Sequence, residues 1–358
     1  MAWQFASEGY NTVLIDKNDV SLGSTSATTA LLQYEIDMSL FDLMKEVGDQ
    51  QAKDCYRAGV DAILKLEKIV GERGIACEFE RRSSIYVAHN QEQRESLLRE
   101  LSCREEAGIE VDWLEAKDLL EKYGVHGYGA LRSKIAACVD GYCLAHALLS
   151  DAATNHSLRI FDHTEIDAIA YQSAANDVLV KGGWHIRTGK IVFATGYETL
   201  TFLKEKVADL ISTYACISEP LDIPKPLREN IFWNTEHPYL YLRSTPDNRI
   251  LVGGADERFK NAFSRDALID KKELTLVDQL KVLVPGLNII PDFTWAGTFG
   301  VTKDALPYIG PHPEYPNSYF VLGFGGNGIT FCIMAMDIIS DAIAGRDNKF
   351  LHYFRFNR

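Results

Sequence analysis

The stretch that decides the fold is MAWQFASEGYNTVLIDK, which spans residues 1–17. Apolar residues recur at helical spacing over residues 1–7, which predicts the end of a helix. Gly9 follows, and glycine most readily takes the left-handed conformation that closes a helix. The apolar run at 12–15 then predicts a short buried strand that ends at Asp16.

A helix, a glycine, a buried strand and an acidic residue in this order are typical of a dinucleotide-binding unit. In such a unit the carboxylate after the second strand accepts hydrogen bonds from ribose hydroxyls. Taken alone, Asp16 is explained equally well as a solvated carboxylate at a strand end. No strand and no G-x-G-x-x-G loop precede the helix in the sequence. We therefore expect a fold without its first strand, with a weaker grip on a pyrophosphate and an exposed sheet edge.

Three later segments carry residue types that bind electron-rich groups. LGSTSATTALL at 22–32 sets a glycine beside hydroxyl side chains, although a polar loop with a helix cap is the simpler explanation of this segment alone. IVFATG at 191–196 is a buried strand that runs into Thr-Gly, which a plain strand and turn also explain. GFGGNGIT at 323–330 opens an apolar helix with more glycines than a tight turn needs, which favours backbone N–H groups converging on a ligand.

Composition narrows the class of function. The chain has 358 residues, and its 37 basic and 50 acidic side chains give a formal net charge of −13. An acidic surface repels phosphate backbones, so we expect no nucleic-acid partner. The 7 cysteines form no C-x-x-C pair, which argues against a metal site and fits a reducing compartment. Without a signal peptide or an apolar run of ~18 residues, the sequence predicts a cytoplasmic protein with no membrane span.

The remaining patterns indicate how the chain is organised. Residues 40–71 predict two helices, or one helix broken near Gly48. Gly182 and Gly183, and the turn at 246–248, predict hairpins. Helix–strand units thus lie at both ends, with mostly antiparallel strands between them. This α/β pattern predicts a nucleotide-binding domain assembled from separated segments, with a sheet-rich second domain inserted.

The order and spacing of these segments resemble the D-amino-acid oxidase / glycine oxidase (DAO) family of FAD-dependent oxidoreductases. The resemblance is carried by residues 13–17, 23–26, 193–196, 249–254, 295–297, 304–310 and 323–328. It implies a truncated FAD/NAD(P)-binding Rossmann-like domain plus an α+β substrate domain with a mostly antiparallel sheet. The implied FAD-binding domain comprises 1–75, 140–212 and 292–358. The implied substrate-binding domain comprises 76–139 and 213–291.

The resemblance also implies roles for individual residues around FAD. Asp16 would bind the adenosine ribose with Lys17 beside it, and Ile166 would offer its backbone to adenine. Three hydroxyl residues would lie near the pyrophosphate and the ribityl chain, namely Ser24, Thr25 and Ser26. Two residues would pack beside the cofactor, namely Thr195 and Gly196. The start of the last long helix would meet the pyrimidine edge of the flavin through Gly326, Asn327, Gly328, Ile329 and Thr330.

The implied activity is that of an FAD-dependent amine or amino-acid oxidase or dehydrogenase, which oxidises a C–N bond by hydride transfer to flavin. Arg243 is the candidate anchor for a substrate carboxylate, because a guanidinium binds carboxylates in a bidentate manner; a surface ion pair is the alternative. Tyr241 shares a strand face with Tyr239 and is a candidate substrate wall, although sheet packing explains it equally well. Lys303 stands where many relatives have proline, and whether it reaches the flavin stays open.

The electron acceptor and the substrate also stay open at this point. Oxidases of the family often hold a lysine over the flavin to assist oxygen, and the strand at 250–252 offers none, so the acceptor is O2 or unknown. The expected partner is a small-molecule amine or amino acid. Two other functions remain: a cofactor-free truncated remnant that acts as an interaction module, and a flavin dehydrogenase that acts on a 2-hydroxy acid.

Overall fold

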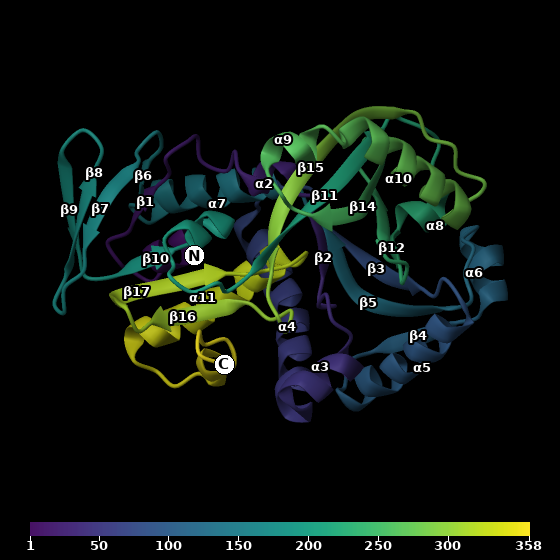
Figure 1. Cartoon of the computed structure of the whole chain (residues 1–358), viewed down its shortest axis with the longest axis horizontal. Helices are drawn as coiled ribbons and strands as arrows, with labels where there is room; N and C mark the ends of the chain where they lie inside the picture. The colour runs from purple at the N-terminus through teal and green to yellow at the C-terminus, as the bar shows by residue number, and fades with distance from the viewer.

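The computed structural model describes residues 1–358 and is built around one large sheet (Figure 1). This sheet has nine strands in the order β15-β11-β14-β13-β12-β3-β5-β2, with β4 paired to β5. Its pairs are antiparallel except β12 with β3, which confirms the predicted mostly antiparallel sheet. The strands are β2 (Leu31–Gln33), β3 (Glu80–Val87), β4 (Val111–Leu114), β5 (Ala130–Cys138), β11 (Asp209–Ser218), β12 (Asn230–Asn234), β13 (Leu240–Ser244), β14 (Ile250–Arg258) and β15 (Pro291–Val301).

Three small sheets form the other part of the molecule. In the first, β1 (Val13–Ile15) pairs in parallel with β6 (Arg159–Phe161). In the second, β10 (Ile191–Phe193) pairs in parallel with β17, and β17 pairs with β16. The third is the projecting meander β7-β8-β9, seen at the far left of Figure 1. Because β1 pairs only with β6 and β10 only with β17, these two parallel pairs lie in separate sheets. The remaining bounds are β7 (Ile166–Ala170), β8 (Asn176–Val180), β9 (Trp184–Thr188), β16 (Tyr308–His312) and β17 (Tyr315–Leu322).

Glycines and polar caps set the ends of the helices. The opening helix closes as predicted, since Tyr10 N donates to Phe5 O and Gly9 N to Ala6 O, both at 3.0 Å. Gly48, with φ of 88°, separates two consecutive helices as predicted. The helices are α1 (Ala2–Ser7), α2 (Ser24–Ala27), α3 (Leu40–Val47), α4 (Asp49–Arg73), α5 (Gln91–Glu106), α6 (Ala116–Tyr123), α7 (Gly141–Asn155), η1 (Gly196–Thr201), α8 (Lys225–Arg228), α9 (Ala262–Asp266), α10 (Ile269–Leu283), α11 (Gly328–Ala344) and α12 (Lys349–Tyr353).

Two large hydrophobic cores and three small clusters follow from this arrangement. The larger contains 35 buried residues and packs α4 against α11 and against the β2–β5 edge of the large sheet. The smaller contains 21 buried residues and lies between the large sheet and α10. Strands β11 and β15 each continue across a predicted domain boundary, at 212/213 and 291/292 respectively. The division into domains therefore stays a prediction at those two points.

A buried ion network fastens three elements to one another. The Arg104 guanidinium on α5 bonds to Glu35 at 3.0 Å and to Glu100 at 2.8 Å. Both carboxylates are almost fully buried, and Glu100 also accepts the backbone N–H groups of Leu40 and Phe41 at the start of α3. Arg104 therefore fixes the positions of α5, α3 and the segment that follows β2 relative to one another.

No helix combines the length and the apolar character needed to cross a membrane.

We expect Arg104→Leu to lower the free energy of unfolding by about 3–5 kcal/mol, because it leaves two buried carboxylates without their cation. Urea unfolding measures this loss. Arg99→Leu, an exposed position on the same helix, is the matched control and should change stability by less than about 1 kcal/mol. Equal losses in the two variants would contradict the structural role of Arg104.

Candidate active site

One large cavity lies between the large sheet and the small sheets. Its volume is about 2290 Å³, whereas pockets for drug-sized ligands span roughly 300–1,000 Å³. The Asp16 end of this cavity lies along β1 and the start of β7. The sheet end is lined by strands β3, β11, β12, β13, β14 and β15 of the large sheet. The start of α11 lines the cavity between these two ends.

The Asp16 end presents the charged pair that the sequence predicts. Asp16 Oδ1 accepts a hydrogen bond from Asn18 N at 3.0 Å, directly after β1. The neighbouring Lys17 forms an ion pair with Glu198 at 2.6 Å. Ile166, at the start of β7, is 39% exposed and lines the same end. The structure therefore brings the three predicted residues Asp16, Lys17 and Ile166 to one end of the cavity.

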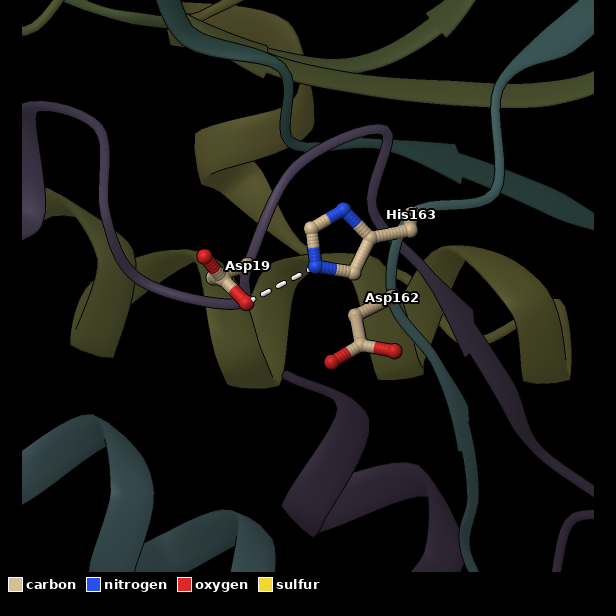
Figure 2. A group of neighbouring side chains, drawn as sticks. All are labelled: Asp19, Asp162 and His163. Carbon is tan, nitrogen blue, oxygen red and sulfur yellow. Dashed lines mark hydrogen bonds and ion pairs between the residues drawn. The ribbon is translucent and has the colours of Figure 1, made fainter.

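A trio of polar side chains lies at this end, on the loops after β1 and β6 (Figure 2). His163 Nε2 lies 2.9 Å from the Asp19 carboxylate, and Asp162 stands beside them. All three side chains are exposed. Backbone bonds from His163 N to Asn18 O and from Thr164 N to Asp16 O join the same two loops. The trio thus belongs to the contacts that fasten these loops, and we assign no metal to it.

The two predicted hydroxyl segments lie along the middle of the cavity. Ser24 and Thr25 line it on the single-turn helix α2, within the segment that a polar loop with a helix cap also explained. Ser26 does not line the cavity, because its hydroxyl turns back to the Gly23 carbonyl at 3.0 Å. Thr195 and Gly196 line the cavity after β10, and Gly196 has a positive φ of 56°.

The start of α11 is fixed by three hydrogen bonds to the end of β2 and the segment that follows it. Asn327 Nδ2 donates to Glu35 O at 2.8 Å, and Thr330 Oγ1 donates to Gln33 O at 3.0 Å. Gly326 N donates to the Asp37 carboxylate at 2.9 Å. The first-turn amides of α11 have no carbonyl within the helix to bind. Gly328, Ile329 and Thr330 therefore present the positive end of a 17-residue helix to the cavity.

Aromatic rings form much of the sheet end. Tyr86 on β3 stacks on Trp233 on β12, with ring centroids 3.5 Å apart and planes 4° from parallel. The predicted wall residue Tyr241 lines the cavity beside Tyr239, and its hydroxyl lies 3.3 Å from Thr29 Oγ1. Trp295 on β15 donates its indole N–H to Ala27 O at 2.9 Å. These rings present a largely apolar surface to a ligand.

Two carboxylates stand among these rings. Asp256 on β14 lines the cavity, and its buried Oδ1 accepts no hydrogen bond. Burial raises the pKa of Asp256 to about 6, and the charge of Asp37 adds to this shift. The exposed surface of Asp37 faces the cavity, and desolvation by the cavity walls raises its pKa. The hydrogen bond from Gly326 only partly opposes that effect.

Two predicted chemical residues lie away from the cavity. Arg243 is 8% exposed and does not line it. Its Nε donates to Thr29 O at 2.7 Å and its Nη1 to Ser244 O at 3.3 Å, so the guanidinium is used within the fold. Lys303 also lies outside the cavity lining, with its Nζ 3.0 Å from Arg358 O. Of the three residues, only Tyr241 lines the cavity, although Arg243 and Tyr241 both contact Thr29.

Sequence reasoning missed Asp37 and Asp256, along with the Tyr86–Trp233 stack. Asp37 follows the short strand β2, and Asp256 lies near the end of the strong hairpin strand β14. An acidic residue directly after an apolar strand is the signal that identified Asp16, and the same signal is present in Leu251–Asp256. The two aspartates are far apart in the chain, so only the folded sheet brings them to one cavity.

A family model described as "FAD dependent oxidoreductase" (DAO) matches residues 1–342. The chain belongs to this family. Glycine oxidase of Geobacillus kaustophilus is 22% identical to it over 98% of this chain and 91% of that protein. Gamma-glutamylputrescine oxidoreductase of Escherichia coli is 23% identical over 98% of this chain and 82% of that protein. The crystal structure of glycine oxidase from Geobacillus kaustophilus has the same fold, with a TM-score of 0.82 at 19% identity and coverage of 100% and 94% of the two chains.

As a member of the DAO family, the chain is an FAD-dependent oxidoreductase. The cavity is large enough for FAD, because its volume is more than twice that of the pockets that hold drug-sized ligands. One end carries a carboxylate that suits ribose hydroxyls, and the middle carries free helix amides that suit an electron-rich ring edge. Adding a Cβ at Gly23 or Gly196 would meet no atom within 4 Å, so backbone approach by a ligand is open there.

The raised pKa of Asp256 gives a test of the cavity's electrostatics in the ligand-free protein. Native Asp256 binds its proton more tightly than the unfolded chain, so its contribution to stability falls as pH rises from about 4 to 6. Asp256→Asn should therefore raise the free energy of unfolding at pH 7 by up to about 3 kcal/mol, and by much less near pH 3. Urea unfolding at both pH values measures the difference. An equal effect at both pH values would mean that Asp256 titrates normally.

Proposed function

We propose that this protein oxidises the C–N bond of an amine or amino acid in the large cavity. One observation carries the proposal: the free amides of α11 open between the Asp16 end and an aromatic, carboxylate-bearing sheet end of the same cavity. The relatives named glycine oxidase and gamma-glutamylputrescine oxidoreductase, both matched over nearly the whole chain, support a nitrogen-bearing substrate.

The residues that would hold FAD are those that the resemblance implies and that line the cavity. Asp16 would accept ribose hydroxyls, with Ile166 beside the adenine. Ser24 and Thr25 would contact the pyrophosphate and the ribityl chain, and Thr195 would pack beside the cofactor. We leave Ser26 out, since its hydroxyl already bonds to Gly23 O. FAD, when bound, accepts a hydride from the carbon that carries the amine.

The chain's own residues would orient the substrate and stabilise charge. The amides of Gly328 and Ile329 favour negative charge at the ring edge that they face, because they form the positive end of α11. Asn327 and Thr330 keep these amides in place through their bonds to the chain after β2. The stacked rings of Tyr86 and Trp233 give the sheet end an apolar wall, and exclusion of water from it by a bound substrate would strengthen the electrostatic interactions within it.

Asp16→Ala should raise the Kd for FAD by about 10- to 100-fold, because it removes charged hydrogen-bond acceptors for the ribose. Quenching of flavin fluorescence on binding measures the Kd. Asp61→Ala on the exposed face of α4 is the control, and its Kd should match that of the unaltered protein. An unchanged Kd in Asp16→Ala would place the ribose elsewhere.

Anaerobic reduction of the FAD-loaded protein tests the reaction itself. Amines and amino acids should bleach the visible flavin absorbance, and 2-hydroxy acids of matched carbon skeleton should not. Bleaching by 2-hydroxy acids alone would replace the proposal with a hydroxy-acid dehydrogenase. Admitting air after reduction then separates the acceptors: fast return of the absorbance indicates an oxidase, and slow return indicates a dehydrogenase with another acceptor.

A further inference from the structure

The sheet end of the cavity carries negative charge without a free counter-cation. Its carboxylates are Asp37 and Asp256, while the carboxylate of Glu35 is already paired with Arg104. The only guanidinium that lines this end belongs to Arg265. Its Nε bonds to Asp266 at 2.7 Å and its Nη1 to Thr298 at 2.9 Å, so its charge is already paired with a carboxylate.

Asp256 is also incompletely satisfied. Its Oδ1 is buried and accepts no hydrogen bond, which costs free energy unless a ligand supplies a donor. The rings of Tyr239 and Tyr241 lie beside it, with centroids 5.9 Å apart, and the Tyr86–Trp233 stack also lines this end. Carboxylates next to exposed aromatic faces form an environment that attracts an organic cation.

We propose that Asp37 and Asp256 bind a second ammonium group of the substrate, one that does not react, and that the substrate is therefore a diamine rather than a simple amino acid. This inference rests on the proposed amine oxidation and names its substrate class. A diamine brings donors to the unpartnered Asp256 Oδ1 and positive charge to the pair. A substrate carboxylate at the same place would meet two like charges.

The reacting nitrogen is the less suitable occupant of this pair. A neighbouring carboxylate stabilises the protonated form of an amine. An amine must lose that proton before its carbon releases a hydride, because the nitrogen lone pair supports the iminium that forms. Two carboxylates around the reacting nitrogen would therefore oppose the reaction. Around a nitrogen that stays protonated throughout, they only improve binding.

Three substrates of matched length isolate the role of the second group. 1,4-Diaminobutane ends in an ammonium, pentylamine replaces that ammonium by a methyl group, and 5-aminopentanoate replaces it by a carboxylate. Anaerobic flavin reduction should show kcat/KM at least about 10-fold higher for the diamine than for pentylamine, with 5-aminopentanoate the poorest. Longer and shorter diamines in the same assay identify the best spacing between the two nitrogens.

One conservative variant assigns this preference to a residue. Asp256→Asn should raise KM for the diamine by about 10- to 100-fold, with little change in kcat and little change for pentylamine. Asp278→Asn, on the exposed face of α10, is the control and should keep the full preference. The visible flavin spectrum of each variant shows that the fold and the cofactor are retained.

Calorimetric titration of 1,4-diaminobutane into the FAD-loaded protein separates this inference from the proposed reaction. Diamine binding that weakens in Asp256→Asn supports the cation pocket, whether or not the flavin is reduced. Failure of the bound diamine to reduce the flavin counts against amine oxidation. If amino acids reduce the flavin while the diamine neither binds nor is preferred over pentylamine, the proposed reaction stands and the cation pocket is overturned. Equal preference in all variants also overturns it.

Discussion

The hydrogen bonds between the start of α11 and the segment after β2 are the interaction on which the rest of the site depends. Asn327 and Thr330 donate to carbonyls of that segment, and Gly326 donates to Asp37. Because α11 also packs on α4 in the main core, its position is set from both sides. The free amides at its N-terminus therefore face the cavity in a fixed direction, as preorganised electrostatic stabilisation requires.

The same segment links this helix to the charge of the cavity. Glu35 is neutralised from behind by the buried Arg104, whereas Asp37, two residues later, faces the cavity. Asp256 reaches the cavity from β14, which lies far from Asp37 in the sequence. The charge of the sheet end is therefore a property of the tertiary structure.

Local patterns predicted much of the fold, because each depends on neighbours in sequence. The cap at Gly9, the break at Gly48 and the predominantly antiparallel sheet all follow from spacing and glycine positions. The Asp16 end was predicted for the same reason. Arg243 shows where this reasoning ends, because the carbonyl of Thr29, which occupies its Nε, comes from a distant loop. Asp37 and Asp256 were not predicted for the same reason, because they line one cavity only after the chain has folded.

We infer that one continuous cavity, from Asp16 to the start of α11, holds FAD in this chain. Titration of the purified protein with FAD, followed by the visible absorption spectrum and by flavin fluorescence, tests this binding directly. We expect saturable binding of one FAD per chain, with a flavin spectrum that stays with the protein through gel filtration. A protein that remains colourless at every FAD concentration would contradict FAD binding in this cavity and favour a cofactor-free interaction module.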